Sequence, residues 1–333
     1  MSLPRAIADK VRTDLRTAAL TPVRVYRTMQ TAIYDVRTGQ RTAADVAKSV
    51  GATLGATLMV VLLLFPIYWI VAASLAANAQ LMSSDGIFPD LAEFGLGAYR
   101  WAIYESNLLF RGEFGDFSQP GALFNSLLVV TVTITVGMAM IIPSAYALSR
   151  REFLGRKKIL YGYVLFTQVG AGLGIAALIA LYALFSNAGL TNNLVVLGVF
   201  YAATALPFNI WLLKTYMDNI PVSYEEAAMI DGAGLWDTIR EIIIPLSKPG
   251  LAVVLIFTWL AGWNEFIIAQ TLLRPENYTL SVELYQLATA GRYETPWTEF
   301  AAFAILFAMP VAIIYFFAQR YVESGLSFGG MEG

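Results

Sequence analysis

The stretch that decides the fold runs from 159 to 213 and reads ILYGYVLFTQVGAGLGIAALIALYALFSNAGLTNNLVVLGVFYAATALPFNIWLL, without one charged residue. An ionised side chain is costly at the centre of a bilayer, and about 20 apolar residues cross the hydrocarbon core. The polar segment SNAGLTNN at 186–193 has the composition of a turn. The sequence therefore predicts two membrane spans here, near 160–185 and 194–213.

The rest of the chain has the same character. Of its 333 residues, 57% are hydrophobic and 14% are charged, whereas a soluble domain carries about a quarter charged residues. Further gaps between charges predict four more spans, near 57–77, 126–148, 250–272 and 300–319. We therefore expect an all-α polytopic membrane protein with about six transmembrane helices.

Composition also excludes several functions. The chain has no Cys and no His, which rules out thiolate nucleophiles, imidazole bases and nearly all zinc sites. Its 24 acidic and 22 basic residues give a net charge of -2, so there is no basic face for nucleic acid. We expect no catalytic residue, no metal site and no nucleic-acid partner.

The distribution of Lys and Arg predicts the orientation. If the N-terminus is cytoplasmic, nine basic residues precede the first span, five lie in 149–158, three in 214–249 and one in the tail. The opposite loops hold four, Arg100, Arg111, Arg274 and Arg292. Cytoplasmic loops are enriched in Lys and Arg, so both termini are predicted to be cytoplasmic.

The loop between the predicted spans four and five contains Ser-Tyr-Glu-Glu-Ala-Ala-Met-Ile-Asp-Gly-Ala-Gly at 223–234. The Ser-x-x-Glu start predicts a capping box, in which Ser223 caps a short helix and Glu226 reaches back. Gly232 and Gly234 then break this helix, and a second one is expected over 235–243, stopped by Pro245. The pattern predicts a rigid pair of short helices on the cytoplasmic surface, of the kind that a motor protein can grip.

This loop resembles that of a known family. Glu226-Ala227-Ala228, then Gly232, then Ile242-Ile243-Ile244-Pro245 is similar to the EAA loop of binding-protein-dependent ABC importers, with Ile244 where Leu is more usual. The flanking segments LPFNIWLL at 206–213, WNEF at 263–266 and GGMEG at 329–333 narrow the resemblance to MalG-like carbohydrate permeases. The resemblance covers roughly residues 50–333.

The resemblance implies the fold and the function of a type I ABC importer. The chain would be a plasma-membrane permease subunit for maltose or maltodextrin, trehalose or a related di- or oligosaccharide, working by alternating access. Relatives with this loop also carry glycerol phosphate, so the substrate stays open. Its expected partners are a second, MalF-like permease, a dimer of ATP-binding subunits and an external solute-binding protein. No Walker A sequence occurs, so ATP and Mg would bind to the partner ATPase and this chain would bind no cofactor.

The resemblance also assigns a domain organisation. Residues 50–321 would form the permease domain, with the coupling loop at 221–249, and residues 322–333 a glycine-rich cytoplasmic tail. The basic segment 1–49 has Val11, Leu15, Ala18 and Ala19 at helical spacing, which fits either a helix on the membrane surface or an ordinary cytosolic tail.

By the same resemblance, the turn of the loop inserts into a cleft on the ATPase. The residues expected to couple are Glu225, Glu226, Ala227, Ala228, Asp231, Gly232, Ala233 and Pro245. Two interpretations of Glu226 stay open, a helix cap alone or a cap that also contacts the ATPase. Gly232 is expected under either one, because a residue without Cβ suits a tight turn.

Polar and aromatic residues within the predicted spans are candidates for a sugar path, since amides bond hydroxyls and indoles stack on sugar rings. They are Gln168, Asn209, Trp211, Trp263, Asn264 and Glu265. Structural roles are equally open for each, and Glu265 can belong to a packing network between spans. A secondary transporter or channel is the competing function, although it gives no reason for the rigid loop.

Overall fold

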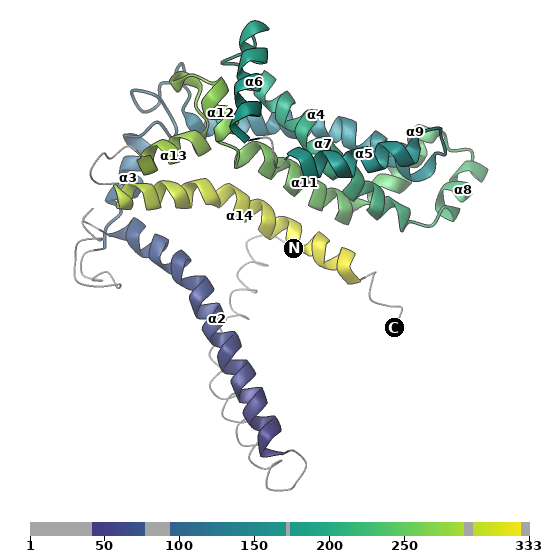
Figure 1. The fold of residues 1–333 in the computed structure, drawn as a ribbon, viewed down its shortest axis with the longest axis horizontal. Helices are drawn as coiled ribbons and strands as arrows, with labels where there is room; N and C mark the ends of the chain where they lie inside the picture. Colours follow the sequence, from purple (N-terminus) through teal and green to yellow (C-terminus); the bar gives the residue numbers. More distant parts are fainter. Residues whose placement is uncertain (1–41, 77–93, 171–173, 290–295, 328–333) are drawn as a thin grey trace. The chain divides into compact units, whose positions relative to one another are not determined.

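The computed structural model describes residues 42–76, 94–170, 174–289 and 296–327. In these ranges the regular structure is helical, apart from two isolated β-bridges. The backbone contacts divide the chain into two compact units, Met1–Trp69 and Ile70–Gly333. Figure 1 shows the ribbon. The expected all-α class is confirmed.

The first unit contains most of one long helix, α2 (Ala43–Leu75). Thr42 starts this helix, because its Oγ1 accepts a hydrogen bond from the Asp45 N–H at 3.2 Å. The stretch Ala47–Leu75 is long and apolar enough to cross a membrane, and it includes nearly all of the first predicted span. Of the N-terminal segment 1–49, residues 1–41 lie outside the described part of the chain.

The second unit is a helical bundle. Helices α4 (Ala122–Arg150), α7 (Leu194–Asp218) and α11 (Lys248–Trp263) pack against one another. Helix α14 (Trp297–Ser327) packs on α11, and α5 (Arg156–Gly170) packs on α7 (Figure 1). One apolar cluster holds the three central helices together and includes the buried side chains of Ile141, Ala145, Ile210, Leu213 and Val254.

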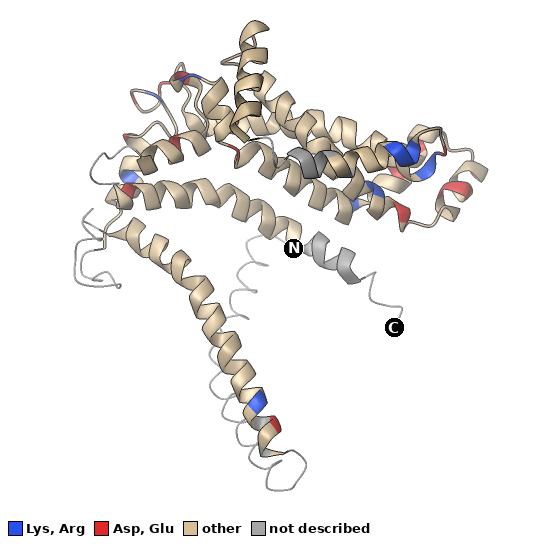
Figure 2. Ribbon diagram, in the orientation of Figure 1, with Lys and Arg blue, Asp and Glu red and all other residues tan. Residues whose placement is uncertain are grey.

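The bundle has two distinct ends. At one end lie α8 (Ser223–Ile230), α9 (Leu235–Asp237), the π-helix η2 (Thr238–Ile243) and α10 (Ile244–Leu246). At the other lie α3 (Gly97–Tyr104), α12 (Ile267–Leu272), the 3-10 turn η3 (Pro275–Asn277) and α13 (Leu280–Thr289). Figure 2 shows charged residues near these ends, whereas the middle of α4 and of α7 carries none.

The spans agree with the prediction in part. Ala47–Leu75, Ala122–Arg150, Leu194–Asp218 and Trp297–Gln319 are each long and apolar enough to cross a membrane. Leu235–Leu246 and Lys248–Trp263 form a further candidate as a pair bent by 82°. The predicted third span corresponds to α5 and α6 (Gly174–Asn187), with 171–173 outside the described residues. The count of six stays a prediction.

The predicted fifth span, 250–272, is not one continuous helix. Helix α11 ends at Trp263 and α12 begins at Ile267. The break has a local cause, because the Glu265 carboxylate accepts hydrogen bonds from the N–H groups of Ile268 at 2.9 Å and Ala269 at 3.2 Å. These contacts satisfy donors at the start of α12 that a continuous helix would have paired within itself.

Close contact between α4 and α7 depends on Gly198. A Cβ at this position would lie 2.8 Å from the Val129 carbonyl oxygen and 2.8 Å from the Val132 Cβ. We expect Gly198→Leu to force the helices apart and to lower stability by about 1–3 kcal/mol or more. The melting temperature of the detergent-purified chain tests this, with Gly51→Leu in α2 as control, where nothing lies within 4 Å. Equal melting temperatures for both variants would contradict it.

Candidate functional site

The candidate site is the loop between α7 and α11, and its first arm is α8. This helix ends in a Schellman motif, in which Gly232 has φ +88°. The Ala233 N–H donates to the Ala228 carbonyl at 2.9 Å, and the Gly232 N–H donates to the Met229 carbonyl at 3.1 Å. A left-handed residue is required at this position, which explains the glycine physically.

The start of α8 differs from the prediction. Ser223 lies inside the helix and the N-cap position is taken by Val222, without a side-chain hydrogen bond. The predicted capping box is therefore wrong. Val222 already has right-handed helical angles, and its carbonyl accepts from the N–H groups of Glu225 at 2.9 Å and Glu226 at 3.1 Å.

The second arm does not stop at Pro245 as predicted. It runs from α9 through η2 into α10, and Pro245 lies inside α10. Proline has no N–H, and the preceding wide turn, in which Ile244 N–H pairs with the Ile239 carbonyl, accommodates it without ending the helix. Ile239 and Ile243 are buried in the cluster between α4 and α7, so this arm is anchored to the bundle.

A buried ion pair anchors the first arm. Glu225 is 3% exposed. Its Oε1 accepts a hydrogen bond from Arg150 Nε at 2.5 Å and its Oε2 accepts one from the Tyr146 hydroxyl at 2.9 Å. Arg150 Nη2 also donates to the Ile220 carbonyl at 2.8 Å. The carboxylate thereby ties α8 to the last turn of α4.

Further polar contacts hold the adjoining segments in place. Arg156 donates to the Leu148 carbonyl at 2.8 Å and to the Ser149 carbonyl at 3.3 Å, which pairs the free carbonyls at the end of α4. The Ser149 hydroxyl donates to Asp218 Oδ1 at 2.7 Å, and Lys214 forms an ion pair with Asp218. The two loops at this end therefore form one connected structure.

The loop exposes four large apolar side chains near its turn. Met229 is 61% exposed, Ile230 86%, Leu235 53% and Trp236 71%. Among the predicted coupling residues, Ala228 and Glu225 are buried, and Ala233 is half-buried. The remaining ones are exposed, namely Glu226, Ala227, Asp231, Gly232 and Pro245. We call the exposed set Met229, Ile230, Leu235 and Trp236 the apolar tip.

Comparison with known proteins identifies the family. The family model described as "Binding-protein-dependent transport system inner membrane component" matches residues 142–328, which include the whole loop. The chain belongs to this family.

Curated relatives support the same assignment. The permease is 32% identical over 285 residues to the maltose/maltodextrin transport system permease protein MalG of Yersinia pestis, covering 82% of this chain and 90% of the relative. It is 33% identical over 274 residues to the galactooligosaccharides transport system permease protein GanQ of Bacillus subtilis, covering 82% and 92%.

A solved structure confirms the fold. A chain from a bacterial ABC transporter involved in the import of the acidic polysaccharide alginate matches this permease with a TM-score of 0.68 at 22% identity. The match covers 84% of this chain and 98% of that one. The family match and the MalG and GanQ relatives confirm the predicted resemblance to a carbohydrate ABC transporter permease.

The predicted sugar-path residues that the structure describes differ in burial and in their contacts. Trp263 is buried, stacks between Trp259 and Phe307, and donates to the Phe307 carbonyl at 3.1 Å. Glu265 accepts from the Tyr201 hydroxyl and caps α12, so it takes part in the packing network that the sequence left open. Asn264 and Trp211 are exposed.

Asn209 and Gln168 are the two remaining candidates for the sugar path. Asn209 is 2% exposed and its Nδ2 donates to the Ala205 carbonyl at 2.9 Å. Its Oδ1 has no hydrogen-bond partner among the described residues, which keeps it a candidate for a contact made in the assembled transporter. The Gln168 side chain lies outside the described part of the chain.

Sequence reasoning missed Tyr146 and Arg150. Both are on α4 and are separated by four residues, so they lie on one face of the helix. A signal was available, because Arg150 is the first charge after a long apolar stretch and Glu225 is one of two acids in a short helix. Their pairing across 75 residues was not readable from either segment alone.

Proposed function

We propose that this chain is the membrane-spanning permease subunit of an ATP-driven sugar importer and that its loop between α7 and α11 couples it to a separate ATPase. The observation that carries the proposal is the combination of a rigid loop and an exposed apolar tip. Glu225 and Ile239 fix the two arms to the bundle, while the apolar tip faces away from it. Force applied at the tip would then move α4 and α7 directly.

The remaining assignments follow from the relatives and the charge distribution. MalG and GanQ carry maltodextrin and galactooligosaccharide in their names, which supports a di- or oligosaccharide substrate here. The partners would be a second, MalF-like permease, two ATP-binding subunits and an external solute-binding protein. The excess of Lys and Arg at the loop end supports a cytoplasmic position for the loop and for both termini.

ATP dependence tests this function. We expect sugar uptake into proteoliposomes that contain the permease pair and the ATPase, with ATP on the ATPase side and the solute-binding protein on the other, and background uptake without ATPase. The reason is that this chain supplies a passive path and the partner supplies the free energy. Omission of ATP, with all subunits present, is the matched control. Concentrative uptake without the ATPase would instead support the secondary transporter that the sequence left open.

A further inference from the structure

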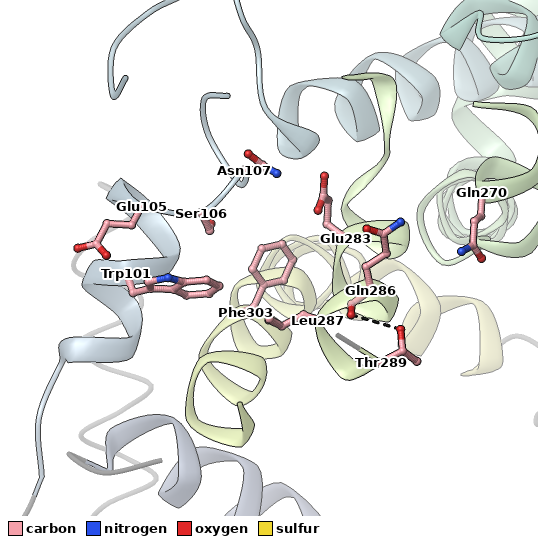
Figure 3. Close-up of a pocket in the computed structure, with 10 residues that line it drawn as sticks. All are labelled: Trp101, Glu105, Ser106, Asn107, Gln270, Glu283, Gln286, Leu287, Thr289 and Phe303. Carbon is pink, nitrogen blue, oxygen red and sulfur yellow. Dashed lines mark hydrogen bonds between the residues drawn. The ribbon is translucent and has the colours of Figure 1, made fainter. Parts of the chain in front are cut away.

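A cavity of about 520 Å³ lies at the end of the bundle opposite the coupling loop. Residues from α3, α13 and α14 line it, together with the segment after α3 and Gln270 of α12. Figure 3 shows Trp101 of α3 pointing toward Phe303 of α14, with Glu283 and Gln286 of α13 beside them. Its volume lies within the range of about 300–1,000 Å³ that is usual for small-molecule sites.

The lining combines flat aromatic surface with amide groups. Trp101 is half-buried and Phe303 is buried, so the ring groups are held by the protein. Asn107, Gln270 and Gln286 supply amides that both donate and accept hydrogen bonds. Rings that stack and amides that bond hydroxyls are the groups that recognise a saccharide.

The charges at the cavity distinguish between kinds of saccharide. Its described lining includes two carboxylates, Glu105 and Glu283, and no Lys or Arg. Glu283 forms an ion pair of 2.9 Å with Arg111, which neutralises it. Burial raises the pKa of the Glu283 carboxyl, and the Arg111 guanidinium opposes that rise. Glu105 is exposed and points away from the other side chains in Figure 3. No Lys or Arg lies among the described lining residues, and the adjoining guanidinium of Arg111 is already paired with Glu283.

We propose that this cavity binds one or two rings of a neutral oligosaccharide at the mouth of the transport path, with Trp101 as the stacking surface and Gln286 as a hydroxyl ligand. This inference rests on the proposed function and adds a substrate class to it. It separates this chain from its structural relative, whose transporter imports the acidic polysaccharide alginate. Acidic oligosaccharides would be disfavoured because their carboxylates would lose water without a free cation to pair with, since Arg111 is already paired with Glu283.

Calorimetric titration of the full-length chain in lipid nanodiscs tests the proposal. Two neutral probes, maltotriose and β-1,4-galactotriose, differ in ring stereochemistry, and alginate trisaccharide is the acidic probe. We expect at least one neutral probe to bind at least tenfold more tightly than the acidic one. We expect both Trp101→Ala and Gln286→Ala to weaken that binding about tenfold or more. Phe117→Ala is the matched control, because Phe117 is an exposed aromatic residue at the same end outside the cavity.

The two variants keep the test decisive if one of them unfolds, and melting curves show which have folded. Wild-type affinity in either variant, provided that it is folded, would overturn the proposal, as would tighter binding of alginate trisaccharide or no binding of either neutral probe. Unchanged sugar binding with impaired assembly with the solute-binding protein would mean that the cavity contacts a protein, and would overturn it too. ATP-driven uptake is measured in a separate experiment. A failure of the sugar-binding test therefore does not decide whether the loop couples the chain to an ATPase.

Discussion

Gly232→Asp is expected to reduce ATP-driven uptake more than tenfold while the chain still inserts and folds. Nothing lies within 4 Å of a Cβ built at Gly232, so the new side chain meets no atom of this chain. Its φ of +88° is left-handed, a region that Asp enters more readily than most residues. The carboxylate of the introduced Asp would lie beside the apolar tip. A bound ATPase would have to remove water from this charge, which costs free energy. Uptake and co-purification of the ATPase measure the effect.

Gly189→Asp is the matched control. Gly189 also has a positive φ, +68°, and open space around its Cβ, but it lies between α6 and α7 at the opposite end of the bundle. The two variants therefore impose similar backbone demands and differ in position. Normal uptake by Gly232→Asp, or an equal loss of uptake in both variants, would contradict the coupling role of this turn.

Long charge-free stretches made the membrane helices predictable from sequence. The helices α2, α4, α7 and α14 each contain a predicted span or nearly all of one. The physical reason is that the cost of burying charge in lipid acts on every residue of a span independently. Gly232 was predictable for a similar reason, since the left-handed turn is a local requirement of one residue.

The break after Trp263 and the role of Glu225 were not predictable in this way. Glu265 reads as one acid within an apolar stretch, and only the fold places its carboxylate on the N–H groups of α12. Ser223 and Glu226 have the spacing of a capping box, yet the chain enters α8 already helical at Val222. Glu225, beside them, is the residue that turns inward, because Arg150 and Tyr146 lie below it on α4. The position of Glu225 depends on partners 75 and 79 residues earlier, and the Glu265 carboxylate also contacts Tyr201, 64 residues earlier.

The buried ion pair of Arg150 and Glu225 holds α8 on α4. The side chains of the pair are only 9% and 4% exposed. Glu225→Met would leave Arg150 as a buried cation without its carboxylate, and breaking such a pair costs about 3–5 kcal/mol. We expect α8 to detach from α4, with strong loss of uptake and faster proteolysis of the loop. Glu226→Met is the control, because Glu226 is its exposed neighbour in the same helix.

A double-variant comparison separates stability from coupling. Arg150→Met with Glu225→Met replaces both charges by apolar groups, which is often neutral or stabilising where a single replacement is not. We therefore expect the double variant to melt close to the wild type and above either single variant. If the pair positions α8 for the ATPase, uptake by the double variant should stay low although its stability returns, since Met cannot reproduce the bonds that fix the carboxylate between Arg150 and Tyr146. Full recovery of uptake would instead show that the pair acts only through stability, and that packing alone is enough to hold the coupling helix on α4.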